Sequence, residues 1–241
     1  VTEVYSTSYT FMALNRDTGA AKCWGINWYR GFLYADCSGM DFSGVTEVYS
    51  TADAFMALNR GTGAAQCWGA SDFGGNCSGM DFSGVTEVYS TAGGAFIALN
   101  RDTGAAQCWG ASDFGGNCSG MDFSGVTEVY STEGAFMALN RETGAAQCWG
   151  LSGTGGNCSG MDFSGVTEVY STSYTFMALN RDTGAAKCWG INWYRGFLYA
   201  DCSGMDFSGV TEVYSTADAF MALNRGTGAA TLTEAAIAAA W

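Results

Sequence analysis

The chain has 241 residues, of which 48% are hydrophobic and 15% aromatic, with 35 glycines, no proline and no histidine. Its formal net charge of −13 argues against binding to nucleic acid or insertion at an anionic membrane surface, because both favour a basic face. Without histidine, a Ser-His-Asp triad is also excluded. Abundant glycines and aromatics are typical of an all-β repeat protein with many turns.

A repeat of about forty residues runs along the chain. The phrase Val-Thr-Glu-Val-Tyr-Ser-Thr begins six times, at spacings of 44, 40, 41, 40 and 44 residues. We predict one repeat domain over residues 1–230. Its repeats are 1–44, 45–84, 85–125, 126–165, 166–209 and a partial repeat 210–230. Residues 1–65 recur unchanged as 166–230, so a period of 165 residues contains the shorter one. Because the chain starts at Val1 without a leader, we interpret it as a segment of a longer product.

Each repeat is predicted to form three short antiparallel strands. In the second repeat the first strand is 45–51, rich in β-branched and aromatic residues, with Glu3 and its equivalents expected to face solvent. The second strand, 54–59, is apolar on both faces, as a buried strand is. A glycine turn leads to a third strand, 64–68, and then to a loop, 69–84, that has room for a fourth strand.

The loop after the third strand is longer in the first and fifth repeats, where it gains aromatic and arginine side chains. We predict that this patch is exposed and binds proteins or glycans, although the same side chains could equally fill the loop. The residues are Trp28, Tyr29, Arg30, Phe32 and Tyr34, with Trp193, Tyr194, Arg195, Phe197 and Tyr199.

The repeat pattern ends after Ala230 in an alanine-rich segment, 231–241. Thr233 can cap a helix and alanine favours one, so we predict a short C-terminal helix that caps the array. The alternative is that residues 230–233 complete the last sheet as a strand.

Residues 54–60, followed by Gly63, 67–69 and 74–75, resemble the repeat of the RCC1-like (regulator of chromosome condensation) β-propeller superfamily. The resemblance covers every complete repeat. It implies a blade of a few antiparallel strands per repeat, and a binding platform more often than an enzyme. The cysteine pair in each repeat is an addition to the family pattern, and an open β-solenoid or stacked array is the alternative architecture.

Ten cysteines form one pair in each complete repeat, and the partial repeat has none. We predict five disulfides, which place the protein in an oxidising compartment, either extracellular or lumenal. The pairs are Cys23–Cys37, Cys67–Cys77, Cys108–Cys118, Cys148–Cys158 and Cys188–Cys202. Free buried thiols and metal ligation are the alternatives, but this spacing is not that of a zinc site. We predict no metal and no cofactor.

Three further positions recur with the repeat. Asn76, Asn117 and Asn157 each begin an Asn-Cys-Ser sequon for N-glycosylation, with chance repeated by duplication as the alternative. One tryptophan per complete repeat is predicted to be a core residue packed by the disulfide rather than a sugar platform; these are Trp24, Trp68, Trp109, Trp149 and Trp189. Asp41 and its equivalents are predicted to cap turns rather than bind calcium.

The sequence therefore favours a non-enzymatic structural repeat protein, a disulfide-stapled extracellular or lumenal scaffold that forms part of a longer fibre or coat. Its expected partners are other copies of itself or other proteins, and glycans, with no nucleic acid and no membrane insertion. The alternative function is a lectin-like or protein-binding β-propeller that uses the long aromatic loops.

Overall fold

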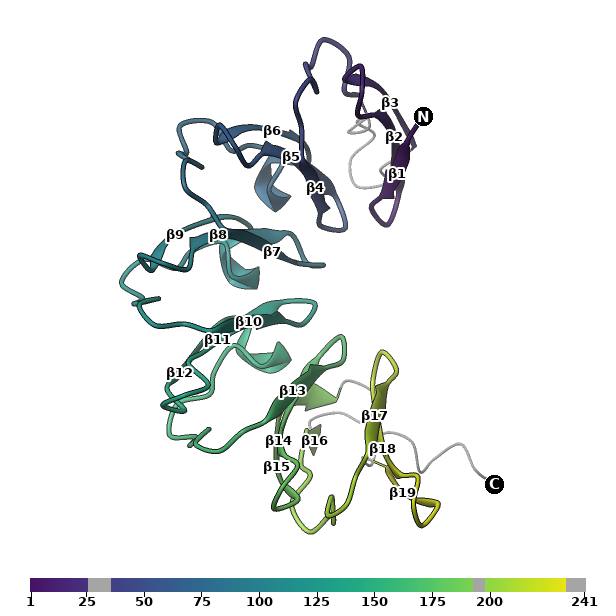
Figure 1. Cartoon of the computed structure of the whole chain (residues 1–241), viewed down its shortest axis with the longest axis vertical. Helices are drawn as coiled ribbons and strands as arrows, with labels where there is room; N and C mark the ends of the chain where they lie inside the picture. The colour runs from purple at the N-terminus through teal and green to yellow at the C-terminus, as the bar shows by residue number, and fades with distance from the viewer. Residues whose placement is uncertain (26–35, 193–197, 233–241) are drawn as a thin grey trace. The chain divides into compact units, whose positions relative to one another are not determined.

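The structure is a computed structural model that describes residues 1–25, 36–192 and 198–232 (Figure 1). The chain divides into two compact units, Val1–Gly125 and Val126–Trp241. Each unit contains three antiparallel sheets, one per repeat. The predicted all-β class, with three to four short strands in each repeat, is confirmed.

Within the first unit the strands follow the chain in three sets of three. They are β1 (Glu3–Ser6), β2 (Thr10–Asn15) and β3 (Ala20–Gly25); β4 (Glu47–Ser50), β5 (Ala54–Asn59) and β6 (Ala64–Gly69); β7 (Glu87–Thr91), β8 (Ala95–Asn100) and β9 (Ala105–Gly110). Short 3-10 turns, η1 (Ser71–Phe73) and η2 (Ser112–Phe114), occupy the loops after β6 and β9. In these loops a 3-10 turn, and no fourth strand, occupies the described residues after the third strand.

The second unit has the same order with one addition. Its strands are β10 (Glu128–Ser131), β11 (Ala135–Leu139) and β12 (Ala146–Gly150); β13 (Glu168–Ser171), β14 (Thr175–Asn180), β15 (Ala185–Asn192) and β16 (Leu198–Tyr199); β17 (Glu212–Ser215), β18 (Phe220–Asn224) and β19 (Ala229–Leu232). The turn η3 (Ser152–Thr154) follows β12. In the long-loop fifth repeat, β16 pairs with β15 and supplies the fourth strand.

The strand β19 pairs with β18, so the last sheet is completed by residues 229–232. Over residues 230–232 the structure therefore adopts the strand that the sequence analysis gave as the alternative. The predicted helix would involve residues 233–241, which lie outside the described residues.

The register gives each sheet two distinct faces. Tyr49 lies opposite Met56, and Met56 opposite Cys67, so these three side chains share one face. Phe55 lies opposite Trp68 on the other face, because successive residues of a strand point to opposite sides. We call the face of the Tyr-Met-Cys row the forward face and the face of the Phe-Trp pair the rear face. Every repeat has the same two faces, except that the third has Ile97 in place of the methionine and the sixth lacks the cysteine and the tryptophan.

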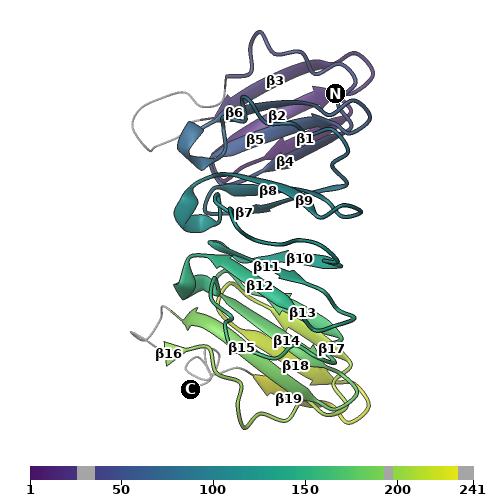
Figure 2. The same ribbon diagram turned by 90° about the vertical axis from the view of Figure 1, so that its left-hand side faces the viewer.

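Within each unit the sheets stack with the forward face of one against the rear face of the next (Figure 2). Adjacent first strands are linked by hydrogen bonds, such as Ser90 Oγ to the carbonyl of Ser50 at 2.8 Å. At Gly63 the chain turns with φ of 73°, and an added Cβ would lie 2.7 Å from the amide nitrogen of Ser83. Glycine is thus needed where the second turn meets the linker to the next sheet.

Candidate functional site

The junction between successive sheets is the most elaborate feature of the described structure. It combines an apolar core, a disulfide and a polar cluster. Between the second and third repeats the apolar core is fully or almost fully buried. Its principal members are Met56, Leu58, Phe82, Val85, Phe96 and Trp109. The first two come from the forward face, the next two from the linker, and the last two from the rear face of the following sheet.

The aromatic part of each junction has a fixed arrangement. The Phe96 ring stacks on Trp109 with centroids 5.0 Å apart, and Phe82 meets the same indole edge-on at 5.3 Å. The Trp109 indole N–H donates to the carbonyl of Gly74 at 3.2 Å. An added Cβ at Gly74 would lie 2.5 Å from the Phe96 ring, so the turn that supplies this acceptor needs glycine. Similar offset and edge-on aromatic pairs stabilise by about 0.5–1.5 kcal/mol beyond their burial.

The predicted core role of the recurring tryptophan fits four positions, since Trp68, Trp109, Trp149 and Trp189 are buried. Trp24, on the rear face of the first sheet, is exposed. The packing partner also differs from the prediction. In the junction of the first two sheets, Trp68 lies with Cys37, so the nearby disulfide belongs to the preceding repeat. The reason is that Cys67 and Trp68 are neighbours in one strand and point to opposite faces.

All ten cysteines are joined as the five predicted pairs, with one pair in each complete repeat. The Cα–Cα separations are 5.5–5.7 Å. The thiol and metal alternatives are therefore wrong. Each disulfide ties the third strand to the start of the linker, five residues before the phenylalanine that enters the junction. Five disulfides are typical of a protein from an oxidising compartment.

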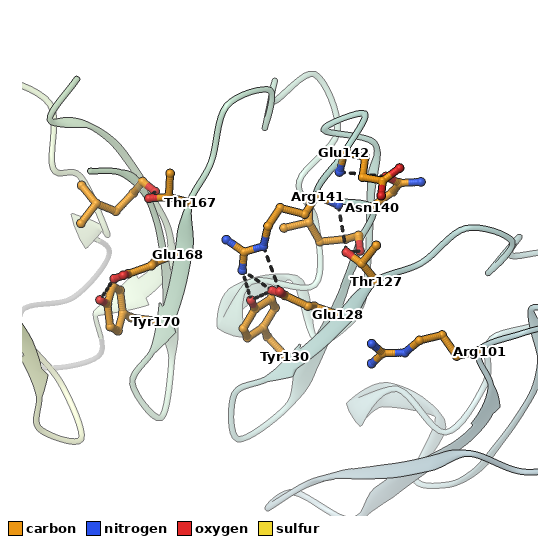
Figure 3. Close-up of polar contacts among 12 residues, drawn as sticks. Arg101, Thr127, Glu128, Tyr130, Asn140, Arg141, Glu142, Thr167, Glu168 and Tyr170 are labelled. Atoms are coloured by element: carbon orange, nitrogen blue, oxygen red, sulfur yellow. Dashed lines mark hydrogen bonds and ion pairs between the residues drawn. The ribbon is translucent and has the colours of Figure 1, made fainter. Parts of the chain in front are cut away.

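A polar cluster of Glu, Tyr and Arg accompanies the apolar core. In the fourth repeat the Arg141 guanidinium donates to Glu128 at 2.9 Å and to the Tyr130 hydroxyl at 2.8 Å, and that hydroxyl donates to Glu128 (Figure 3). The backbone N–H of Arg141 donates to Thr127 Oγ1 at 3.0 Å, which fixes the start of the arginine side chain. The same ion pair occurs in all six repeats. The pairs are Glu3–Arg16, Glu47–Arg60, Glu87–Arg101, Glu128–Arg141, Glu168–Arg181 and Glu212–Arg225.

Some of these arginines also reach the next sheet. Arg16 Nη1 donates to the carbonyl of Val45 at 3.2 Å, and Arg181 Nη1 donates to the carbonyl of Val210 at 2.9 Å. The arginine therefore links the forward face of one sheet to the backbone at the start of the next. The expectation that Glu3 and its equivalents form a solvated face is wrong. The sequence carries a partial signal of the cluster, a glutamate two residues before a tyrosine with an arginine after the second strand, but the strand register is also needed to bring the arginine beside them.

Two members of the recurring clusters, Glu47 and Tyr89, have a pKa that is shifted away from neutral pH. The hydrogen bond from Arg60 lowers the pKa of Glu47, although burial opposes this. Burial, together with the hydrogen bond to Glu87, raises the pKa of Tyr89 to about 12. Each shift moves the pKa away from 7, whereas a general acid or base works best with a pKa near the operating pH. These shifts are therefore more consistent with a role in holding neighbouring sheets together than with acid–base catalysis.

The turn residues behave as the sequence predicts. Asp41 Oδ1 accepts from the Ser43 backbone N–H at 2.9 Å and also from the Ser43 hydroxyl, and these bonds lower the pKa of Asp41. Among the described residues, no three His, Cys, Asp or Glu side chains lie close enough together to hold a metal ion. The described part of the chain also contains no helix with the length and apolar character needed to span a membrane.

The sequon asparagines are exposed. Asn76 Oδ1 accepts from the Ser78 backbone N–H at 3.0 Å, and Asp36 makes the equivalent bond to Ser38 at 2.8 Å in a long-loop repeat. Asparagine and aspartate therefore serve the same turn. Of the predicted aromatic patches, nine residues lie outside the described residues: Trp28, Tyr29, Arg30, Phe32 and Tyr34, and Trp193, Tyr194, Arg195 and Phe197. Tyr199 lies on β16.

Repeated sheets of three or four antiparallel strands, stacked face to face, define an all-β repeat protein with a β-propeller-like fold. No protein-family model matches the sequence, and no curated protein is similar to it in sequence. Solved structures do match the fold, and they agree with the predicted β-propeller-like repeat as a similarity of fold.

One of them is the entire ectodomain of the receptor kinase CR4 from Physcomitrella patens, with 16% identity and a TM-score of 0.52 over 93% of this chain. This chain spans 59% of that ectodomain. A second is the CRINKLY WD40 ectodomain of the receptor kinase ACR4 from Arabidopsis thaliana, with 14% identity, a TM-score of 0.51 and coverage of 93% of this chain and 76% of that one. Prp20p from Saccharomyces cerevisiae has 14% identity, a TM-score of 0.49 and coverage of 95% and 70%.

Proposed function

We propose that this chain is a non-enzymatic scaffold of an extracellular or lumenal compartment, and that its repeat domain, residues 1–230, is one segment of a longer fibre or coat. The observation that carries the proposal is the repeated junction. At every pair of successive sheets within a described unit, the same apolar core recurs with one disulfide and one Glu-Tyr-Arg cluster. The contacts that recur along the chain are therefore those that hold neighbouring sheets together.

Three further features support a scaffold. Residues 1–65 and 166–230 are identical, which suits a task performed by repetition. The middle strand of each internal sheet is buried on both faces, as in β5 and β14. An oxidising compartment agrees with the five disulfides.

Electron microscopy of the oxidised protein tests the proposal. We expect elongated particles whose length grows with protein concentration. A matched sample, reduced and alkylated, should lose them if the disulfide-stapled junctions support the assembly. Isolated compact particles in the oxidised sample at every concentration would contradict the proposal.

The second candidate function is binding of a protein or a glycan through the long aromatic loops. One observation favours it: in the fifth repeat β15 continues to Asn192 and pairs with β16, so the inserted loop emerges from an ordered two-stranded base. The chain offers a matched control, in which the short loop 70–76 replaces the long loop of each long-loop repeat. A glycan array and a pull-down should give signals that the short-loop variant loses. Blank results with the intact chain would contradict this function.

We also propose N-glycosylation at Asn76, Asn117 and Asn157, which are exposed beside a disulfide. The chain contains its own control substitution. Asn76→Asp removes a sequon but keeps the turn, because Asp36 forms the same turn in a long-loop repeat. Expressed through a eukaryotic secretory pathway, the chain should lose mass on treatment with peptide-N-glycosidase, and Asn76→Asp should carry one glycan fewer. An unchanged mass would refute the modification.

A further inference from the structure

The first and last sheets each present a face that the interior sheets bury. On the rear face of the first sheet, Phe11 is 46% exposed and Trp24 is 48% exposed. Their equivalents in the identical segment 166–230 are Phe176 and Trp189, which are 0% and 7% exposed. The sequence around each pair is the same, so the difference comes only from what lies against the face.

On the last sheet it is the forward face that is more exposed than its interior equivalents. Tyr214 is exposed, and Met221 and Leu223 are half-buried. Met56 and Leu58, their equivalents in the identical earlier segment, are completely buried. The rear face of the first sheet and the forward face of the last sheet are thus more exposed than the identical residues of the interior sheets.

The interior junctions show what covers such a rear face. Phe176 and Trp189 are covered by Met137 and Leu139 of the preceding forward face, together with the linker residue Phe163. The forward face of the last sheet carries the same residue types, a methionine and a leucine in the same register beside a tyrosine. It therefore has the methionine and the leucine that cover Phe176 and Trp189 in the interior, without the linker phenylalanine among the described residues.

A polar feature points to the same partner. Arg181 donates across its junction to the carbonyl of Val210, the first residue of the next repeat. Arg225 occupies the same position on the last sheet, and its side chain is 65% exposed beside Glu212. The residue equivalent to Val210 at the start of the first sheet is Val1, which is also exposed. Arg225 is thus available to donate to the carbonyl of a Val1.

We propose that the rear face of the first sheet, formed by Val4, Phe11 and Trp24, binds the forward face of the last sheet in a second copy of this chain. The contact rests on the proposed function, and it names the surfaces that would join the segments of the fibre. Because the two faces differ, the contact is heterologous and leaves one free face of each kind at the ends of every complex. Association then continues beyond the dimer.

Sedimentation with complementary variants tests the contact. Phe11→Glu disables the rear face and Met221→Glu the forward face, since each places a carboxylate in an apolar contact. The unaltered chain should show masses that rise with concentration through multiples of 25.3 kDa. Each variant alone should remain monomeric, with an association constant lower by roughly 30-fold or more, the effect of a central interface residue.

The mixture of the two variants gives the decisive result. One intact rear face and one intact forward face remain, so a 1:1 mixture should form a dimer of twice 25.3 kDa, about 51 kDa, and nothing larger. Circular dichroism and the mass deficit of ten hydrogens, for five disulfides, check that both variants fold. If Met221→Glu does not fold, Tyr214→Asp, at an exposed position, replaces it.

Two outcomes overturn the contact. The first is a mass of 25.3 kDa at every concentration. It would contradict the contact whether the two end faces remain exposed or pack against each other within one molecule. The second is self-association that persists in either variant alone, because that association must use another surface. Fibres that persist in the Phe11→Glu variant leave the proposed function standing, whereas no assembly by the unaltered chain counts against both.

Discussion

Replacing Phe176 by alanine should destabilise the protein far more than the same change at Phe11. The two residues lie in identical segments of 65 residues, so local sequence and strand propensity are matched. They differ in what covers them: Phe176 is buried against the fourth sheet, whereas Phe11 is half-exposed. The comparison therefore isolates the contribution of the junction.

The structure sets the size of the effect. Phe176 is fully buried and stacks on Trp189 with centroids 5.2 Å apart. Truncation of such a residue leaves a cavity and costs about 3–5 kcal/mol. Phe11 is half-exposed and stacks less closely on Trp24, at 5.8 Å. Its truncation should cost about 1 kcal/mol, as is common for a partly exposed site. The expected difference is thus at least about 2 kcal/mol.

Urea unfolding followed by circular dichroism measures this difference. The protein should be dilute enough to be monomeric, because association would cover Phe11. With a slope of about 2 kcal/mol per molar urea, the transition that involves the fifth sheet should shift by roughly 1.5–2.5 M in Phe176→Ala. Phe176→Leu is the control that keeps most of the apolar volume. Equal shifts for the Phe11 and Phe176 variants would refute the reasoning.

Three further predictions concern the disulfide and the polar cluster. Replacing Cys67 and Cys77 together by alanine should cost about 2.7 kcal/mol by the loop-entropy relation for a separation of 10, measured by urea unfolding against the oxidised parent. Arg60→Met should cost about 1 kcal/mol, and Arg225→Met, in an identical segment but 65% exposed instead of 33%, should cost less, with both effects reduced in 1 M salt. Because Arg60 lowers the pKa of Glu47, the stabilisation from that carboxylate is present above the unfolded pKa of about 4.3 and is lost as the pH falls through the folded value. Stability measured from pH 7 down to pH 3 should fall less steeply in Arg60→Met than in the parent, and equal slopes would contradict the assigned pairing.

The strands could be predicted closely because their patterns are local. The prediction of 54–59 matches β5, since a run of apolar residues that ends at a turn is typical of a strand packed on both sides, as β5 is. The cysteine pairs were equally accessible, because one pair per complete repeat leaves a short loop within each repeat. Turn aspartates such as Asp41 bond to residues only two positions away, so sequence spacing is enough to find them.

The polar cluster could not be predicted from local pattern alone. Alternation indicates that Glu47 and Tyr49 share a face, but it does not show that Arg60 returns beside them. That depends on the register, in which Glu47 lies opposite Leu58, two residues before the arginine. The covering of the recurring tryptophan depends on the next sheet. Phe11 and Phe176 have the same sequence neighbours and opposite burial, so no local rule could separate them.

The proposed end-to-end contact should be weaker than the junctions inside the chain, for two reasons. Interior junctions contain a linker phenylalanine held by a disulfide, as Phe163 is by Cys148–Cys158, whereas Met221 and Leu223 have no such residue beside them among the described residues. Interior sheets are also joined covalently, while a second copy must lose its translational and rotational freedom, at an estimated cost of about 4–15 kcal/mol. Repulsion between chains of net charge −13 adds to this cost. Assembly through these faces should therefore be reversible and depend on concentration, even though each complete repeat within it is held by its own disulfide.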